Sequence, residues 1–187
     1  RLGLIIVPLN WRLVPAELNY ILGDSGAKVL FHDDNFLDQV PAALDGLATL
    51  AVNTSDRLDA LIDKSQGLAV ATDADLSDPM FIVYTSGTTG RPKGAVLTQE
   101  SILWNAIISV HAHDFTPADH ILNMLPLFHV GGINIQMMPC FFIGGTMTLH
   151  PAFDADETIR ALEYQGITTT VCVPTVMKAL MFHPDWG

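Results

Sequence analysis

Cysteines and long apolar runs are scarce in this sequence, and each scarcity excludes a class of protein. Cys140 and Cys172 are the only cysteines in 187 residues, and neither has a CxxC or histidine partner at metal-binding spacing. We expect both to be reduced core residues, which is typical of a cytoplasmic protein. Pro or Gly interrupts the longest apolar stretches well short of about 18 residues, so we expect no transmembrane segment.

Basic residues are also few. Nine Lys and Arg stand against twenty Asp and Glu, which gives a net charge of −11. This balance argues against nucleic acid or an anionic membrane surface as a partner, so any anion must be bound locally. With 49% hydrophobic and 16% charged residues, the chain is globular and slightly more apolar than usual. That excess suggests that part of the surface meets more protein, and it leaves oligomerisation open.

Strand-length apolar runs alternate with helix-length amphipathic stretches, which predicts an α/β fold with layered, mostly parallel sheets and flanking helices. The expected strands are 4–9, 27–32, 47–52, 80–84, 94–98, 121–125, 146–150 and 167–174. The expected helices are 15–26, 55–63, 99–114, 133–143, 154–166 and 175–182.

The segment YTSGTTGRPKG, residues 84–94, follows the strongest strand. Its glycines allow backbone N–H groups to point at an anion, its hydroxyls add donors, and Lys93 adds a mobile positive charge. A loop of this composition is most often a surface turn, but the order of these residues favours a polyphosphate clamp. It is not a Walker loop, because Pro92 and Gly94 flank Lys93 and the chain returns to a strand instead of opening a helix. We therefore expect a mobile hairpin flap, and an ordinary ATPase or kinase is the least favoured class.

The same segment resembles the phosphate-loop motif of adenylate-forming enzymes, the superfamily of acyl-CoA synthetases, luciferases and peptide-synthetase adenylation domains. LGLIIVPLNWRLVPAELNYILGDSGAKVLF, LPLFHVGG and ITTTVCVPTVM are similar to further segments of that superfamily, in the same order. The fatty acyl-CoA synthetases look most similar among its branches. The resemblance implies that residues 1–187 are part of the large N-terminal AMP-binding domain, cut at both ends and lacking the C-terminal domain.

The resemblance also implies a two-step reaction of a carboxylic acid with ATP and then coenzyme A, in the presence of Mg²⁺, within fatty acid metabolism. The resemblance implies that the β- and γ-phosphates of ATP are held by the motif residues Thr85, Ser86, Gly87, Thr88, Thr89, Gly90 and Lys93. Thr85 is the hydroxyl expected beside magnesium. His129 is the expected catalytic residue, beside the acyl carboxylate, and Gly131 and Gly132 are expected to leave room for an acyl chain.

Several other residues have ordinary structural interpretations. Arg91 is expected to be a solvated side chain, Tyr84 a core residue with a polar tip, and Thr175 a helix N-cap. His111, His113 and His120 do not form a zinc pattern and are expected at solvated helix ends. Acidic residues are expected as caps and exposed faces: Asp33, Asp34, Asp38, Asp154, Asp156 and Glu157.

The superfamily's adenine and magnesium motif, its ribose-binding Asp, its hinge and its adenylating lysine do not occur in this sequence. We expect them downstream of Gly187, which predicts that the isolated chain is inactive although its parent is an enzyme. Two alternatives stay open. One is an adenylation domain that loads a carrier protein, and the other is a noncatalytic module that binds a nucleotide or an acyl group.

Overall fold

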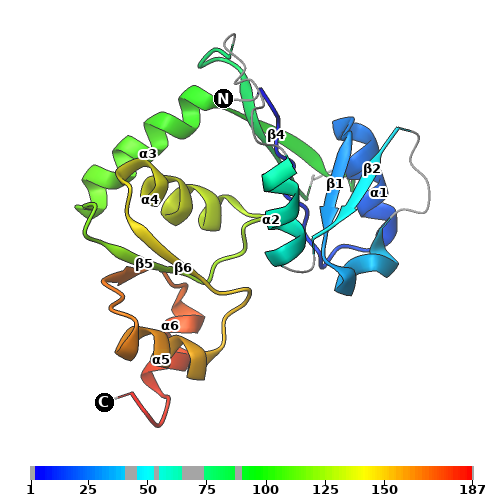
Figure 1. Cartoon of the computed structure of the whole chain (residues 1–187). Coiled ribbons are helices and arrows are strands. Elements are labelled where there is room, and N and C mark those ends of the chain that lie inside the picture. The colour runs from blue at the N-terminus through cyan, green and yellow to red at the C-terminus, as the bar shows by residue number, and fades with distance from the viewer. Residues whose placement is uncertain (1–2, 41–45, 53–54, 65–73, 87–89, 187) are drawn as a thin grey trace. The chain divides into compact units, whose positions relative to one another are not determined.

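Helices and parallel strands alternate along the chain in the computed structural model (Figure 1), which describes residues 3–40, 46–52, 55–64, 74–86 and 90–186. These residues form two compact units, which divide between Leu97 and Thr98. The parallel pairing and the flanking helices confirm the predicted α/β fold. Each unit is described below by itself.

The first unit contains α1 (Pro15–Ser25), β1 (Val29–His32), η1 (Asp34–Gln39), β2 (Ala48–Ala51), α2 (Ser55–Lys64), β3 (Pro79–Thr85) and β4 (Lys93–Thr98). Helix α1 begins with Pro15 in its first turn and ends at Gly26, whose φ of 63° is left-handed, as the sequence predicts. β1 and β2 pair in parallel, and β3 pairs with β4.

The strand predicted over residues 4–9 is reduced to one parallel bridge between Ile6 and Phe81. Ile6 N–H donates to Met80 O, and Ile82 N–H donates to Ile6 O. Pro8 has no N–H to continue this ladder, which explains why the pairing stops so soon.

The second unit contains α3 (Gln99–His113), β5 (His120–Asn123), η2 (Gly131–Met137), α4 (Met138–Ile143), β6 (Thr146–Leu149), α5 (Ala155–Tyr164), β7 (Thr169–Thr170) and α6 (Pro174–Met181). Its parallel sheet has the order β6-β5-β7, so β5 is central. Ile121 and Leu122, which are fully buried neighbours on β5, face opposite sides of the sheet. Ile121 packs with Phe115 and Cys140, whereas Leu122 packs with Met124 and Ala161. Helices therefore cover both faces: α3 and α4 lie on one, and α5 and α6 on the other (Figure 1).

Most predicted elements of this unit are found within a few residues of their predicted bounds, and three predictions differ in a way that has a physical reason. The helix predicted over 133–143 consists of a π-helix, η2, followed by α4, and the junction lies beside Pro139, which cannot donate an i→i−4 hydrogen bond. The strand predicted over 167–174 is only Thr169–Thr170, where the Thr170 hydroxyl also donates to Leu122 O. The prediction of Thr175 as an N-cap is wrong, because Val173 is the cap and Pro174 occupies the first turn.

Candidate functional site

The predicted phosphate loop connects β3 to β4. Thr85 ends β3, Ser86 follows it, and both are exposed. Gly90 has a φ of 85°, a backbone conformation that favours glycine, and the exposed Lys93 begins β4. Gly87, Thr88 and Thr89 lie outside the described residues. The described donors of the loop thus stand at adjoining ends of two paired strands.

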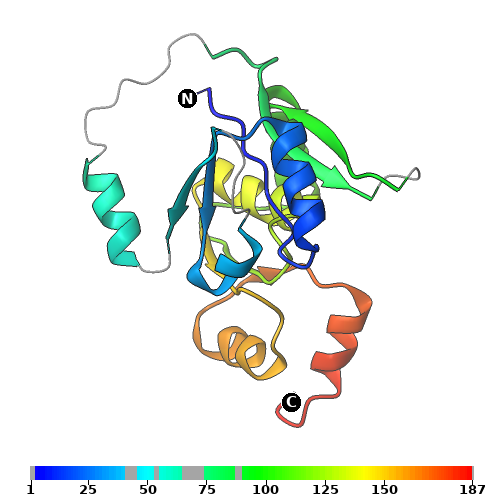
Figure 2. The same cartoon turned by 90° about the vertical axis from the view of Figure 1, so that its right-hand side faces the viewer.

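The loop is a hairpin connection and does not open a helix. β3 and β4 run side by side as a ribbon (Figure 2), and the helix α3 begins only at Gln99, after β4. A connection of this length is too short for a parallel crossover. The geometry confirms the prediction that this chain returns to a strand and so differs from a Walker loop.

The base of the hairpin is packed around Tyr84. A side chain at Gly94 has no room, because its Cβ would lie 2.6 Å from Ile82 Cγ2 and 3.1 Å from Tyr84 Cζ. The Tyr84 hydroxyl donates to Asp24 Oδ2 at 2.6 Å, the length of a strong hydrogen bond to a carboxylate. Partial burial, and after it the Asp24 carboxylate, raise the pKa of Tyr84. Tyr84 therefore has the predicted polar tip, and its partner on α1 was not predicted.

Arg91 is exposed, as predicted, but it is not without contacts. Its guanidinium carbon lies 5.8 Å from the centre of the Tyr20 ring, at the outer limit of a cation–π contact. Tyr20 also donates a longer hydrogen bond, 3.5 Å, to the other carboxylate oxygen of Asp24. Tyr20 and Asp24 are one turn apart on α1, so one face of this helix contacts both the loop and β3.

Lys93 provides a positive charge where the loop meets β4. Within the described residues, Lys93 forms no ion pair, so its ammonium is free to meet an anion from solvent. Together with the hydroxyls of Thr85 and Ser86, it fits a polyphosphate. Thr85 can offer one oxygen to Mg²⁺, and no cluster of three metal-binding side chains occurs in the part of the chain that the structure describes. A single hydroxyl fits a magnesium ion that takes its other ligands from substrate phosphates and water.

The loop with the predicted His129 follows the central strand β5 of the second unit. His129 is exposed, and its Nδ1 accepts a hydrogen bond of 3.1 Å from the Gly131 N–H. With Nδ1 used as an acceptor, Nε2 is the ring nitrogen that can donate a hydrogen bond. His129 N–H donates to Pro126 O, while Gly132 N–H donates to His129 O. The backbone thus orients the imidazole with a donor left for a ligand.

Gly132 was expected to leave room for an acyl chain, and this prediction is wrong. A Cβ at this position would lie 2.5 Å from Pro126 O and 2.7 Å from Leu125 O, so the space is filled by backbone of the same loop. At Gly131 the nearest atom to a Cβ would be His129 Nδ1, at 3.3 Å. The two glycines allow the loop to fold tightly on itself.

Two buried amides that the sequence did not single out support this region. Asn123 at the end of β5 donates from Nδ2 to Gly132 O at 3.0 Å and accepts at Oδ1 from Leu125 N–H at 3.0 Å. Gln136 of η2 donates to Leu122 O at 3.0 Å. Both side chains are fully buried. For Asn123 the signal in the sequence is a polar residue that ends an otherwise apolar strand.

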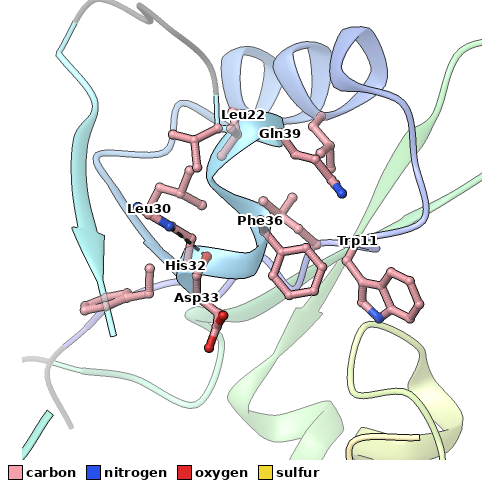
Figure 3. A pocket seen from close by; sticks show the side chains of 11 residues that line it. Trp11, Leu22, Leu30, His32, Asp33, Phe36 and Gln39 are labelled. Carbon is pink, nitrogen blue, oxygen red and sulfur yellow. Dashed lines mark hydrogen bonds between the residues drawn. The ribbon is translucent and has the colours of Figure 1, made fainter. Parts of the chain in front are cut away.

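A cavity of about 270 Å³ in the first unit was also not predicted (Figure 3). It lies among α1, β1 and η1, and its walls are mostly apolar, with Trp11, Leu22 and Phe36 among them. Asp33, at its rim, caps η1 by accepting from Asn35 N–H. An apolar wall and a carboxylate do not suit phosphate, so this cavity is not the candidate nucleotide site.

The other side chains weighed from sequence have structural roles. His111 and His113 lie exposed in the last turn of α3, as predicted, and His113 Nδ1 bonds to Ser109 O on the same helix. The prediction of a solvated helix end is wrong for His120, which begins the central strand β5, is half-buried and bonds through Nε2 to the Thr148 hydroxyl. Asp33 and Asp154 are helix caps, as expected. Cys140 is buried, Cys172 is half-buried, and both are free thiols. None of the described helices is long and apolar enough to cross a membrane.

Known proteins resemble this chain over nearly its whole length. Indoleacetate–CoA ligase of Aromatoleum aromaticum is 43% identical over 100% of this chain and 38% of that protein. Feruloyl-CoA synthase of an Amycolatopsis species is 39% identical, over 98% of this chain and 36% of the relative. Long-chain-fatty-acid–CoA ligase FadD13 of Mycobacterium tuberculosis is 31% identical over 100% of this chain and 38% of that protein. The chain thus spans 36–38% of the length of these relatives.

The fold is shared with a solved structure. ATP-bound MatB from Rhodopseudomonas palustris superposes with a TM-score of 0.82 at 29% identity, over 96% of this chain and 36% of that one. The sequence pattern of the AMP-binding enzyme family matches residues 1–186. The resemblance seen first in residues 84–94 therefore extends from one end of the chain to the other, and the chain belongs to the AMP-binding enzyme family.

Proposed function

We propose that this chain is the ATP-binding part of an ATP-dependent acid–CoA ligase. The observation that carries the proposal is the Gly/Ser/Thr segment 84–94, placed between paired strands with Lys93 exposed and without an ion-pair partner among the described residues. Membership in a family whose relatives are named as CoA ligases supports the same reaction. Residues 1–187 would then be part of the N-terminal domain of the natural gene product.

The proposed reaction has two steps. A carboxylate oxygen of the acid attacks the α-phosphorus of ATP, and the bond to the β-phosphate oxygen breaks to release pyrophosphate. The thiolate sulfur of coenzyme A then attacks the acyl carbon, the bond to the adenylate oxygen breaks, and AMP leaves. Both steps have an anionic leaving group, so groups that hold and neutralise phosphate account for most of the expected catalysis.

The residues of this chain would act on the first step. Lys93 with the hydroxyls of Thr85 and Ser86 would bind the β- and γ-phosphates and stabilise the departing pyrophosphate, and we propose the same role for Gly87, Thr88, Thr89 and Gly90. Thr85 would also contact Mg²⁺, which neutralises further phosphate charge when it is bound. His129 would donate from Nε2 to the acid's carboxylate, because its Nδ1 is already engaged by Gly131.

The acid that we propose is aromatic. The relatives named for indoleacetate and ferulate are 43% and 39% identical, whereas the relative named for long-chain fatty acids is 31% identical. The fatty acid expected from sequence is the second candidate, supported by that third relative and by the apolar residues around His129.

The test is carboxylate-dependent exchange of labelled pyrophosphate into ATP by the natural gene product, with arylacetic, hydroxycinnamic, medium-chain and long-chain acids. Exchange that is strongest with an arylacetic or hydroxycinnamic acid supports the proposal in full. Exchange only with fatty acids keeps the ligase and replaces its substrate. Absence of exchange with every acid, while ATP still binds, favours a noncatalytic module. Comparing free coenzyme A with a phosphopantetheine carrier as the acceptor separates a CoA ligase from a carrier-loading domain.

A further inference from the structure

We infer that Asn123 is a positioning residue, which holds residues 125–132 as a closed loop and thereby fixes the imidazole of His129. The inference rests on the proposed role of His129 and extends it to a side chain that does not touch substrate. Asn123 stands at the end of β5, two residues before the loop begins.

The amide of Asn123 connects the two ends of the loop. Its Oδ1 accepts from Leu125 N–H, and its Nδ2 donates to Gly132 O, each at 3.0 Å. One side chain therefore satisfies a backbone donor where the loop starts and a backbone acceptor where it ends. A side-chain amide offers an acceptor and a donor on two separate atoms of one short, planar group, so it can bond to both ends of the loop at once.

A second observation shows how closely the two ends meet. The Cβ that Gly132 lacks would lie 2.7 Å from Leu125 O and 2.5 Å from Pro126 O, so no other residue allows this approach. Between the two ends, His129 N–H donates to Pro126 O, and His129 O accepts from Gly132 N–H. His129 is thus bonded to both sides of the loop that Asn123 closes.

The complete burial of Asn123 indicates that this residue does more than fill space in the core. Asn123 is 0% exposed, at a position where leucine has a similarly branched side chain and no polar group to desolvate. A leucine there would leave Leu125 N–H and Gly132 O without these partners. The π-helix η2 that begins at Gly131 supports a functional role, since such segments are frequent at functional sites.

The test uses the natural gene product with Asn123→Asp, which keeps the acceptor for Leu125 and removes the donor to Gly132. Asn123→Ser is a second variant with a smaller side chain. The control is Asn105→Ala, which removes one amide-to-carbonyl hydrogen bond, from Asn105 Nδ2 to Asn134 O at 2.7 Å, without touching the loop.

Kinetics are the first readout. We expect kcat of acid-dependent pyrophosphate exchange to fall about 10-fold to 100-fold in the Asn123 variants, as for a displaced catalytic group, with the KM for ATP changed less than about twofold. Asn105→Ala is expected to leave kcat within about twofold. Asn123 variants that keep the kcat of the control, or that change only the KM for ATP, would overturn the inference.

Amide hydrogen exchange is the second readout and does not depend on activity. In the wild-type protein we expect the amides of Leu125, His129 and Gly132 to be protected, and Asn123→Asp should lose that protection at least tenfold more than Asn105→Ala. Wild-type amides that exchange as in a free peptide would refute the closed loop even if neither variant folds. A protected loop in a protein without pyrophosphate exchange would refute the proposed function and leave the closed loop standing.

Discussion

Tyr84 on β3 donates a hydrogen bond of 2.6 Å to the carboxylate of Asp24 on α1, across sixty positions of sequence. Tyr84 immediately precedes Thr85, the first expected phosphate ligand, so this bond fixes the base of the phosphate loop. Tyr84→Phe should lower the free energy of unfolding by about 1 kcal/mol, the usual value of one hydrogen bond. The matched control is Tyr20→Phe, which removes only the 3.5 Å bond to the same carboxylate and should have a smaller effect in chemical denaturation.

The same pair predicts a dependence on alkaline pH. Because the pKa of Tyr84 is raised in the folded chain, the protonated phenol stabilises the fold fully below its unfolded pKa of about 10, and this stabilisation is lost as pH rises toward the folded value. Denaturation between about pH 9 and 11.5 should show stability falling with pH, and less steeply in Tyr84→Phe. Equal slopes in both proteins would show that this phenol does not titrate differently on folding.

Lys93 should matter for nucleotide binding and not for stability. Its side chain is exposed and forms no ion pair among the described residues, so Lys93→Ala should change the unfolding free energy by less than about 0.5 kcal/mol. The KM for ATP should rise about tenfold or more, because a charge-assisted contact to phosphate is lost. Arg91→Ala is the control for removal of a nearby cation, and a similar rise in KM there would contradict the special role of Lys93.

Two glycines should respond to alanine in opposite directions. Gly132→Ala places a Cβ against backbone oxygens at 2.5 and 2.7 Å and should cost about 1–3 kcal/mol of stability. Gly23 lies within α1 with nothing near the Cβ it lacks, so Gly23→Ala should stabilise by about 0.5–1 kcal/mol. Thermal melting of both variants gives the comparison. A tolerated alanine at residue 132 would show that the loop can open at little cost.

Acid should weaken the second unit through Asp119. The Thr168 hydroxyl, and then the N–H and hydroxyl of Thr116, hold the pKa of Asp119 below its ordinary value. The carboxylate therefore contributes stability above its unfolded pKa of about 4, and that contribution is lost as pH falls through the folded value. Unfolding measured between about pH 5 and 2 should show a shallower loss in Asp119→Asn and in Thr168→Val than in the wild type. If stability falls equally steeply with decreasing pH in all three proteins, Asp119 does not contribute in this way.

The sequence predicted this fold where signals are local and strong. Pro15 and Gly26 bracket α1, and the Gly/Ser/Thr order of residues 84–94 indicated both the hairpin and the family. It predicted less well where tertiary contacts decide. The edge strand β7 is only two residues long, with the Thr170 hydroxyl bonded to Leu122 O of β5, and the π-helix η2 is followed by α4 next to Pro139.

The supporting residues of the candidate site were the hardest to find. Asn123 and Asp24 carry no sequence motif, because their partners are a backbone amide, a backbone carbonyl and a tyrosine sixty positions away. Lys93 was predicted from the composition of its loop and again from the resemblance, whereas His129 was predicted from the resemblance alone. Their assigned roles remain predictions, to be tested with the variants above.

The most direct test of the central claim is transfer of oxygen from the acid to AMP. The natural gene product is incubated with ATP, coenzyme A and an arylacetic acid labelled with ¹⁸O in its carboxylate. The mass of the released nucleotide is then measured by mass spectrometry. If the carboxylate attacks the α-phosphorus, one ¹⁸O atom appears in AMP for each acyl-CoA formed, with unlabelled pyrophosphate. Label in inorganic phosphate together with ADP would mean attack at the γ-phosphorus, and it would contradict adenylation by this protein.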